Sequence, residues 1–133
     1  MPCGSNSDAL MDAFDTESVD LLAQVFNKKR SSEIIDIHNL RVIRSGNFHH
    51  IDAHVVVPEY LDVATVHLLT HNFEIEVVKA YKYDGEIAFH IDPCKRAFCK
   101  QCEVPECKIR KAQFENLKLT DRNNLIVGPQ YTN

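Results

Sequence analysis

The sequence lacks any long apolar run. Its longest candidates, such as the three valines at 55–57, have the length of a strand, whereas a helix that spans a bilayer needs roughly 18–20 apolar residues. The N-terminus also lacks the basic flank and apolar stretch of a signal peptide, because acidic residues such as Asp8, Asp12 and Asp15 lie there instead. We therefore expect a cytoplasmic protein without direct membrane insertion.

A basic excess is missing as well. The 133 residues carry a formal charge of -4, the opposite of what a protein that follows nucleic-acid phosphates needs. Hydrophobic residues make up 44% of the chain and charged residues 26%, a mixture typical of a globular domain rather than a disordered chain. The length fits one domain with tails, and no internal repeat is visible.

The spacing of apolar residues changes between helical and strand-like along residues 8–93. It predicts, in order, a helix at 8–29 with Asp15-Thr16 as a second possible start, strands at 34–44 and 50–57 joined by a turn at 45–47, a helix at 61–80, a turn at Asp84-Gly85, and a strand at 86–92. This order predicts an α+β domain in which helices cover one face of a small three-stranded sheet.

Three further segments lie outside this predicted domain. Residues 94–117 form a cysteine-rich extension, whose basic part at 108–117 has helical propensity. Residues 118–133 are a turn-rich tail to which we assign no function, and residues 1–7, with the isolated thiol of Cys3, form a second tail.

The seven histidines are the most informative residues, because imidazole and carboxylate are ligands that zinc accepts. Alternation places Ile51, Ala53, Val55 and Val57 on the core face of one strand and Ile87, Phe89 and Ile91 on that of another. Asp52 with His54, and His90 with Asp92, then share the opposite face. His67 and His71 lie side by side on the second helix, and His38 opens the first strand. A lone histidine on a polar face is usually only solvated, so the pattern by itself leaves the site open.

Four motifs follow one another along the chain: HNLRVIRSGN at 38–47, IDAHVVV at 51–57, VHLLTH at 66–71 and FHIDP at 89–93. In order and spacing they resemble the motifs of the C-terminal cytoplasmic domain of cation diffusion facilitators. The likeness covers roughly residues 15–93. Its motifs are specific enough to make a chance match implausible.

The resemblance implies a metallochaperone-like, ferredoxin-like fold that pairs with a second copy into a V-shaped dimer. It implies metal ligands at His38, His54, His67, His90 and Asp92, with the Asp92 carboxylate bridging two ions, and we add His71 as a further candidate. Metal would draw the two arms of the dimer together by differential affinity.

The chain also departs from the family. It lacks the transmembrane helices that move the cation, so it cannot transport by itself, and Asn39 replaces the usual acid. The family fixes no role for His49, His50 or His71. We expect a natural stand-alone chain rather than a fragment.

Four of the five cysteines lie in one short segment, as Cys94-x4-Cys99-x2-Cys102-x4-Cys107. In a reducing compartment such a cluster binds metal more often than it forms disulfides. The spacings suit a zinc tetrathiolate, although the first three cysteines also match part of a plant-type iron–sulfur pattern. Free thiols, or a redox pair of Cys99 and Cys102, are the alternatives to metal binding. We favour metal over these alternatives, and zinc over an iron–sulfur cluster. Cys94 could instead lend its thiolate to the histidine site.

Three function hypotheses follow from these features. The first is a non-enzymatic protein that binds divalent transition metals, zinc before others, as a homodimeric sensor, regulator or buffer with a membrane cation transporter as a possible partner. The second is an iron–sulfur or thiol redox protein built on the cysteine cluster. A zinc hydrolase comes last, because no separate general base, nucleophile or substrate-pocket signature accompanies the histidines.

Overall fold

The computed structural model describes residues 15–127. The elements are α2 (Thr16–Lys29), β1 (Asp36–Ser45), β2 (Phe48–Val57), α3 (Val63–Ala80), β3 (Asp84–Pro93), the 3-10 helix η2 (Arg96–Gln101) and α4 (Arg122–Val127). The first five elements follow the predicted order of helix, two strands, helix and strand. The expectations for residues 1–14, including Cys3, and for residues 128–133 fall outside the described residues.

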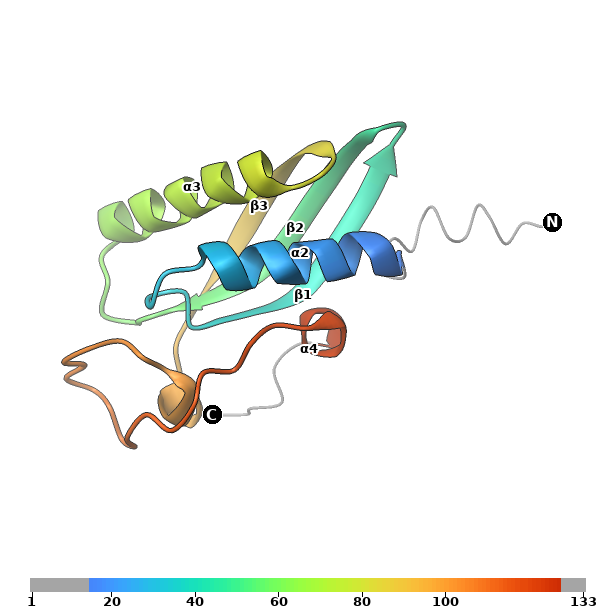
Figure 1. Cartoon of the computed structure of the whole chain (residues 1–133). Coiled ribbons are helices and arrows are strands. Elements are labelled where there is room, and N and C mark those ends of the chain that lie inside the picture. Colours follow the sequence, from blue (N-terminus) through green and yellow to red (C-terminus); the bar gives the residue numbers. More distant parts are fainter. Residues whose placement is uncertain (1–14, 128–133) are drawn as a thin grey trace.

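The three strands form one sheet in the order β1-β2-β3. β1 and β2 pair antiparallel through a two-residue turn, in which Gly46 has a φ of 61°. Glycine tolerates this positive φ, which tight hairpin turns require. β3 pairs parallel to β2, and α3 makes the crossover between them. Both α2 and α3 lie on one face of the sheet, as the α+β prediction requires (Figure 1).

The main core fills the space between these two helices and the sheet. Residues Ile51, Ala53, Val55 and Val57 of β2 are buried in it, as the alternation predicted. From the helices, Phe26 of α2 packs its ring 5.9 Å from that of Phe73 of α3. Burying each large apolar side chain is worth about 1.5–3 kcal/mol, so this layer supplies most of the hydrophobic stabilisation.

Both long helices start at an aspartate. The side chain of Asp15 accepts a hydrogen bond from the backbone N–H of Ser18, and that of Asp62 accepts one from Thr65. Each bond satisfies an N–H group that has no partner within the helix. Lys28 and Lys29 lie in the last turn of α2, where cations meet the negative end of the helix dipole.

A β-bulge interrupts the predicted alternation of β1. His38 pairs with His54 and Arg41 with Asp52, so β1 has one residue more than β2 over this stretch. Asn39 occupies the extra position with a φ of 51°, a left-handed conformation that asparagine tolerates better than most residues. The extra residue lets Ile37 and Leu40 both face the core while His38 faces the other side.

Two predictions about β3 are wrong. Asp84-Gly85 is not a turn but the start of the strand, and the bend lies before it. A Cβ on Gly85 would lie 2.3 Å from the carbonyl oxygen of His49, so this glycine allows a close approach of two backbones. Ile91 is 40% exposed rather than in the core, because β3 is an edge strand and Ile91 borders an open hollow beside the start of α3.

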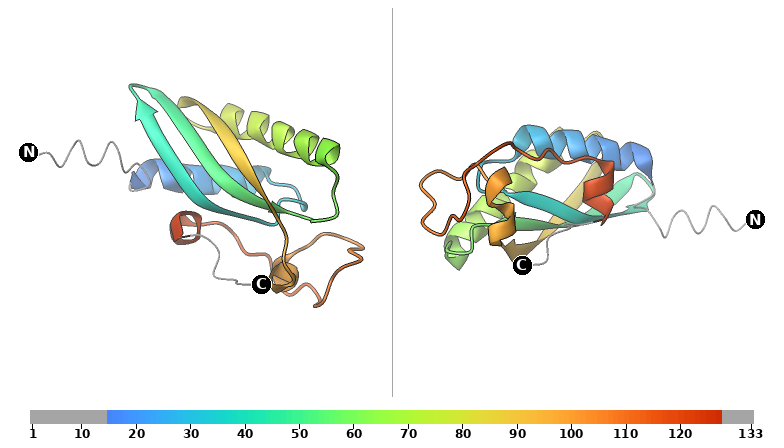
Figure 2. Two further views of the ribbon diagram at one scale, coloured as in Figure 1. Left: turned by 180° about the vertical axis from the view of Figure 1, so that it is seen from behind. Right: turned by 90° about the horizontal axis from the view of Figure 1, so that it is seen from below.

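The C-terminal segment also differs from the prediction. Residues 108–117 are not helical, because their backbone bonds elsewhere: the N–H of Glu115 donates to the carbonyl of Lys100 over 2.7 Å. The short helices η2 and α4 have no counterpart in the prediction. α4 inserts Leu125 into the main core beside β1 and α2, and Figure 2 shows this segment passing around the end of the sheet to reach it.

A second, smaller core lies on the opposite face of the sheet. Ile35 and Val56 pack there against Phe98, Cys102 and Val104 of the C-terminal segment. The two faces of the sheet are therefore covered by different parts of the chain. None of the helices among residues 15–127 is long and apolar enough to cross a membrane.

Candidate metal centre

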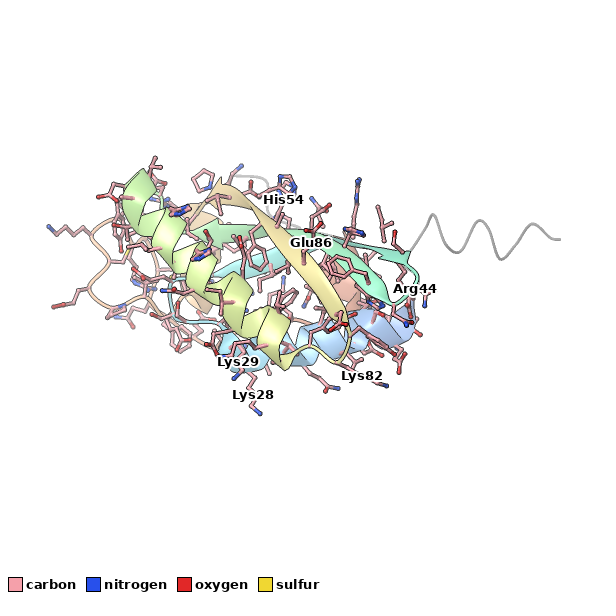
Figure 3. The ribbon with its side chains drawn as sticks, turned by 90° about the horizontal axis from the view of Figure 1, so that it is seen from above. Lys28, Lys29, Arg44, His54, Lys82 and Glu86 are labelled. Atoms are coloured by element: carbon pink, nitrogen blue, oxygen red, sulfur yellow. The ribbon has the colours of Figure 1, made fainter. Side chains whose placement is uncertain are left out.

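Three histidines form a row across the three strands. His38 of β1 pairs with His54 of β2, which pairs with His90 of β3. The ring centroids lie 5.4 Å apart for His38 and His54 and 4.9 Å apart for His54 and His90. The row lies on the face away from α2 and α3. Figure 3 shows His54 on that side, with Lys28 and Lys29 of α2 on the other.

One carboxylate oxygen connects two of these rings. Oδ2 of Asp92 lies 3.1 Å from Nε2 of His38 and 3.1 Å from Nδ1 of His54. Among residues 15–127, these three side chains are the one group of three potential ligands whose atoms all lie within 4.8 Å of one another. Two imidazoles and a carboxylate are a donor set that suits zinc and similar divalent ions.

Asp36 supports His38 from behind. Its Oδ2 lies 3.0 Å from Nδ1 of His38, and both side chains are almost fully buried. Such a carboxylate fixes the orientation of a ligand ring and raises its basicity. Both ring nitrogens of His38 thus face carboxylate oxygens, and only the protonated ring can donate to both; a metal ion at Nε2 would replace one of those protons. Asp36 is not among the site residues predicted from the sequence, although its position two residues before His38 indicates that both share one face of the strand.

A largely buried arginine lies behind the same region. Burial lowers the pKa of the Arg30 guanidinium, while the carboxylates of Asp36 and Glu103 raise it. Nη2 of Arg30 donates to the carbonyl of Ile35 over 3.3 Å, whereas its Nε and Nη1 are buried without a partner within residues 15–127. Arg30 therefore lies close to Asp36, the carboxylate that contacts His38, and to Glu103 of the C-terminal segment.

His90 completes the row but does not join the group of three. It is exposed, and with His54 and Asp52 it borders a wide hollow on the sheet whose far side is lined by Ile126 of α4. The ring of His90 stacks on that of His54, with centroids 4.9 Å apart. The structure therefore places His90 beside the group formed by His38, His54 and Asp92.

His67 and His71 are not brought to this group. They lie on α3, with ring centroids 5.9 Å apart and planes at 7°, and both are exposed. Burial raises the pKa of nearby Glu74, an effect that the two histidines oppose. Because α3 covers the other face of the sheet, these two residues stand apart from the row within one copy of the chain.

The remaining histidines of the hairpin have structural surroundings. His49 is buried, with Nδ1 2.8 Å from the hydroxyl of Tyr81, and stacks on Tyr83 at 4.5 Å. His50 pairs on the surface with Glu86 at 2.8 Å. Neither belongs to the group around Asp92.

The four cysteines of the C-terminal segment face one small cavity. Cys94, Cys99, Cys102 and Cys107 all line it, together with apolar side chains such as Phe98. All four are free thiols, and no three of their sulfurs lie within 4.8 Å of one another. Burial raises the pKa of the Cys94 and Cys102 thiols. The structure therefore gathers the cysteines around one space without closing them into a tight cluster.

Comparisons with known proteins bear on the fold and the family of this chain. Among curated proteins, no sequence matches the chain. Among solved structures, the C-terminal domain of MamB, a magnetosome protein of Desulfamplus magnetovallimortis BW-1, is 13% identical and has a TM-score of 0.51, with 59% of this chain and 95% of that chain covered. This likeness shows a shared fold.

A second solved structure is the metal-bound C-terminal domain of the CzcD transporter from Thermotoga maritima. It is 22% identical, covers 70% of this chain and 94% of its own, and has a TM-score of 0.44. At the level of sequence families, residues 15–94 match the cytoplasmic domain of cation efflux proteins. The cysteine-rich residues after Cys94 lie beyond that match. Since it spans more than half of the chain, the chain belongs to the family of cation efflux protein cytoplasmic domains.

Proposed function

We propose that this chain binds a divalent transition-metal ion, zinc before others, through His38, His54 and Asp92. The observation that carries the proposal is the single Asp92 oxygen at 3.1 Å from a nitrogen of each of two imidazoles. The buried Asp36 carboxylate behind His38 adds the support that metal-ligating histidines usually have. These features suit a metal site better than a chance surface cluster.

The donor set leaves room for further ligands. Zinc takes four ligands in most protein sites, and His38, His54 and Asp92 supply three. His90, whose ring lies 4.9 Å from that of His54, is a further donor beside these three. Asp92 has a second oxygen, so it can bridge two ions, the second held by His90.

A second copy of the chain is the natural source of the remaining ligands. α3 exposes apolar side chains next to its two histidines: Val63, Leu68, Ile75 and Val78. An exposed apolar stripe of this kind marks a surface for a protein partner. We propose a homodimer in which His67, with His71 beside it, approaches the Asp92 site of the other copy.

In this account the protein is a metal-responsive module rather than an enzyme. An ion shared by two copies favours the closed dimer because it binds the closed dimer more tightly than the open one. The family is a domain of cation efflux proteins, so the partner we propose for the closed dimer is a membrane cation transporter. The chain would act as a sensor, regulator or buffer of the metal that such a transporter moves.

Calorimetric zinc titration of wild-type protein and two matched histidine variants tests the site. His50 and His54 lie on the same strand and face the same side of the sheet, but only His54 contacts Asp92. We expect His54→Ala to weaken binding by about 10–100-fold or more and His50→Ala to leave it unchanged. Equal affinity of all three proteins would contradict the proposal.

Small-angle scattering tests the dimer separately. We expect zinc to make the wild-type dimer more compact and His67→Ala to abolish the change while His54 still binds the ion. If the metal-bound and the metal-free protein have the same shape, the proposed regulation is wrong, although the proposed metal site still stands.

A further inference from the structure

The C-terminal extension, defined here as residues 94–121, has little of its own to keep it folded. Its one regular element is η2, and its core on the sheet consists of five buried residues: Ile35, Val56, Phe98, Cys102 and Val104. Small irregular segments with so small a core usually need a cross-link or a metal ion. Among residues 15–127 the cysteines are all free thiols.

Those thiols surround one cavity of the right size for a single ion. All four cysteines line a space of about 20 Å³, whereas a single water needs about 10–15 Å³ on the same measure. Such a space suits one metal ion better than an iron–sulfur cluster, which contains several heavy atoms. Sulfur ligands in a tetrahedral arrangement select zinc.

Arg110 holds the loop that carries the cysteines. Its guanidinium donates to the carbonyls of Cys99 and Cys102 over 2.8 and 2.7 Å, and to those of Val104 and Ala112 over 3.1 and 3.0 Å. One partly buried cation thus fixes the backbone at the central pair of thiols and in the segment that follows it. This is the kind of outer support that orients metal ligands.

Further N–H groups point at the sulfur atoms themselves. The backbone N–H of Lys111 lies 3.5 Å from Sγ of Cys99, and Nη2 of Arg96 lies 3.5 Å from Sγ of Cys94. Between residues 94 and 112 the sequence has six basic residues and two acidic ones. A zinc ion with four thiolates carries a net charge of -2, so this local positive excess fits it.

The central pair of cysteines is already arranged as a turn. The N–H of Cys102 donates to the carbonyl of Cys99 over 3.2 Å at the end of η2, and Cys94 and Cys107 flank this pair at x4 spacings. In a closed tetrathiolate the sulfurs lie about 3.8 Å apart, given Zn–S bonds of about 2.3 Å. No three of the sulfurs are that close together here, so the ion would draw them inward by side-chain rotation.

We infer that Cys94, Cys99, Cys102 and Cys107 hold one structural zinc ion that fastens the extension to the open face of the sheet. This site is separate from the one at Asp92 and does not depend on the proposed function. Three of its four cysteines lie beyond the family match, which ends at Cys94. Zinc binding holds the extension against Ile35 and Val56.

Cobalt substitution tests the ligands on the unmutated full chain. Co²⁺ bound to thiolates shows intense sulfur-to-metal absorption that a histidine–carboxylate site lacks. We expect this absorption in wild-type protein and in Asp92→Asn, and its loss in Cys99→Ser/Cys102→Ser. Its absence from wild-type protein, or a protein that instead purifies brown with bound iron, would overturn the zinc site.

Elemental analysis and trypsin digestion provide the second readout. Protein purified without added metal should hold about one zinc ion per chain more than Cys99→Ser/Cys102→Ser, and Cys3→Ser serves as the matched control with no loss. Trypsin should cut the lysine- and arginine-rich extension of the double variant first and leave residues 15–93 intact. Equal zinc content and equal resistance in wild-type and double variant would contradict the inference.

Discussion

The two faces of the sheet are covered by two very different layers. On one face, α2 and α3 bury large side chains such as Phe26 and Val77 completely. On the other, an irregular extension covers one end through a core of five buried residues, three of which are its own, and the histidine row lies beside it. The first layer is stabilised by apolar burial. The second relies on directed contacts: the Arg110 hydrogen bonds, those between Asn27 and Thr120 and, we propose, bound metal.

Truncating one phenylalanine in each layer should give the largest difference in effect between the two layers. Phe26 is fully buried among Phe73 and Phe89, whereas Phe98 belongs to the small core. We expect Phe26→Ala to lower the free energy of unfolding by about 3–5 kcal/mol, measured by denaturant titration. Phe98→Ala should mainly expose the extension to protease. If both variants lower global stability equally, the two layers fold as one unit.

The next prediction concerns Asp36, the aspartate that contacts His38. Asp36→Asn keeps the shape but removes the charge that orients the His38 ring at 3.0 Å. We expect zinc affinity to fall by about 10–100-fold, with less effect on thermal stability than Phe26→Ala. Asp52→Asn is the control, because Asp52 lies on the same face outside the group of three. Unchanged affinity in Asp36→Asn would mean that His38 needs no such support.

Asn27 of α2 holds the far end of the extension, next to the ion pair between Asp20 of α2 and Arg122. Asn27 accepts from the backbone N–H of Thr120 over 2.8 Å and donates to its carbonyl over 2.9 Å. We expect Asn27→Ala to weaken docking of this end by about 2 kcal/mol, since each such bond is worth about 0.5–1.5 kcal/mol. Hydrogen exchange should rise in residues 118–127 and stay unchanged in β2. Faster exchange throughout the chain would show that Asn27 holds more than the extension.

The bulge in β1 should give the smallest effect. Asn39 has a φ of 51°, and the left-handed region costs most residues roughly 1–2 kcal/mol. We expect Asn39→Ala to lose about 1 kcal/mol and Asn39→Gly to lose nothing, both by thermal denaturation. An alanine variant as stable as the glycine variant would show that the strand can pair without the bulge.

The sequence predicted the parts of the fold that follow a regular period. The order of α2, β1, β2, α3 and β3 and the core positions Ile51 to Val57 are confirmed, because alternation and helical spacing report burial directly. The metal ligands stay a prediction, which came through the family resemblance. Of the residues named, the structure brings together His38, His54 and Asp92. The strand pairs that align His38, His54 and His90 are long-range contacts, which no local pattern reveals.

The rest of the structure depends on tertiary contacts. Asn39 broke the alternation of β1, and nothing in its neighbours signalled the extra residue. Residues 108–117 have helical propensity, but Arg110 bonds to four carbonyls around it and the tertiary contacts prevail. Asp36 was missed for a different reason. The alternation indicated on which face of the strand it lies, but its supporting role becomes visible only once its contact with His38 is known.

Anomalous diffraction from zinc-loaded crystals would locate the bound ion itself. We expect a zinc peak within bonding distance of His38 Nε2, His54 Nδ1 and a carboxylate oxygen of Asp92, at about 2.0–2.2 Å from each. A zinc-loaded crystal with no anomalous peak between these three side chains would contradict the proposed metal site.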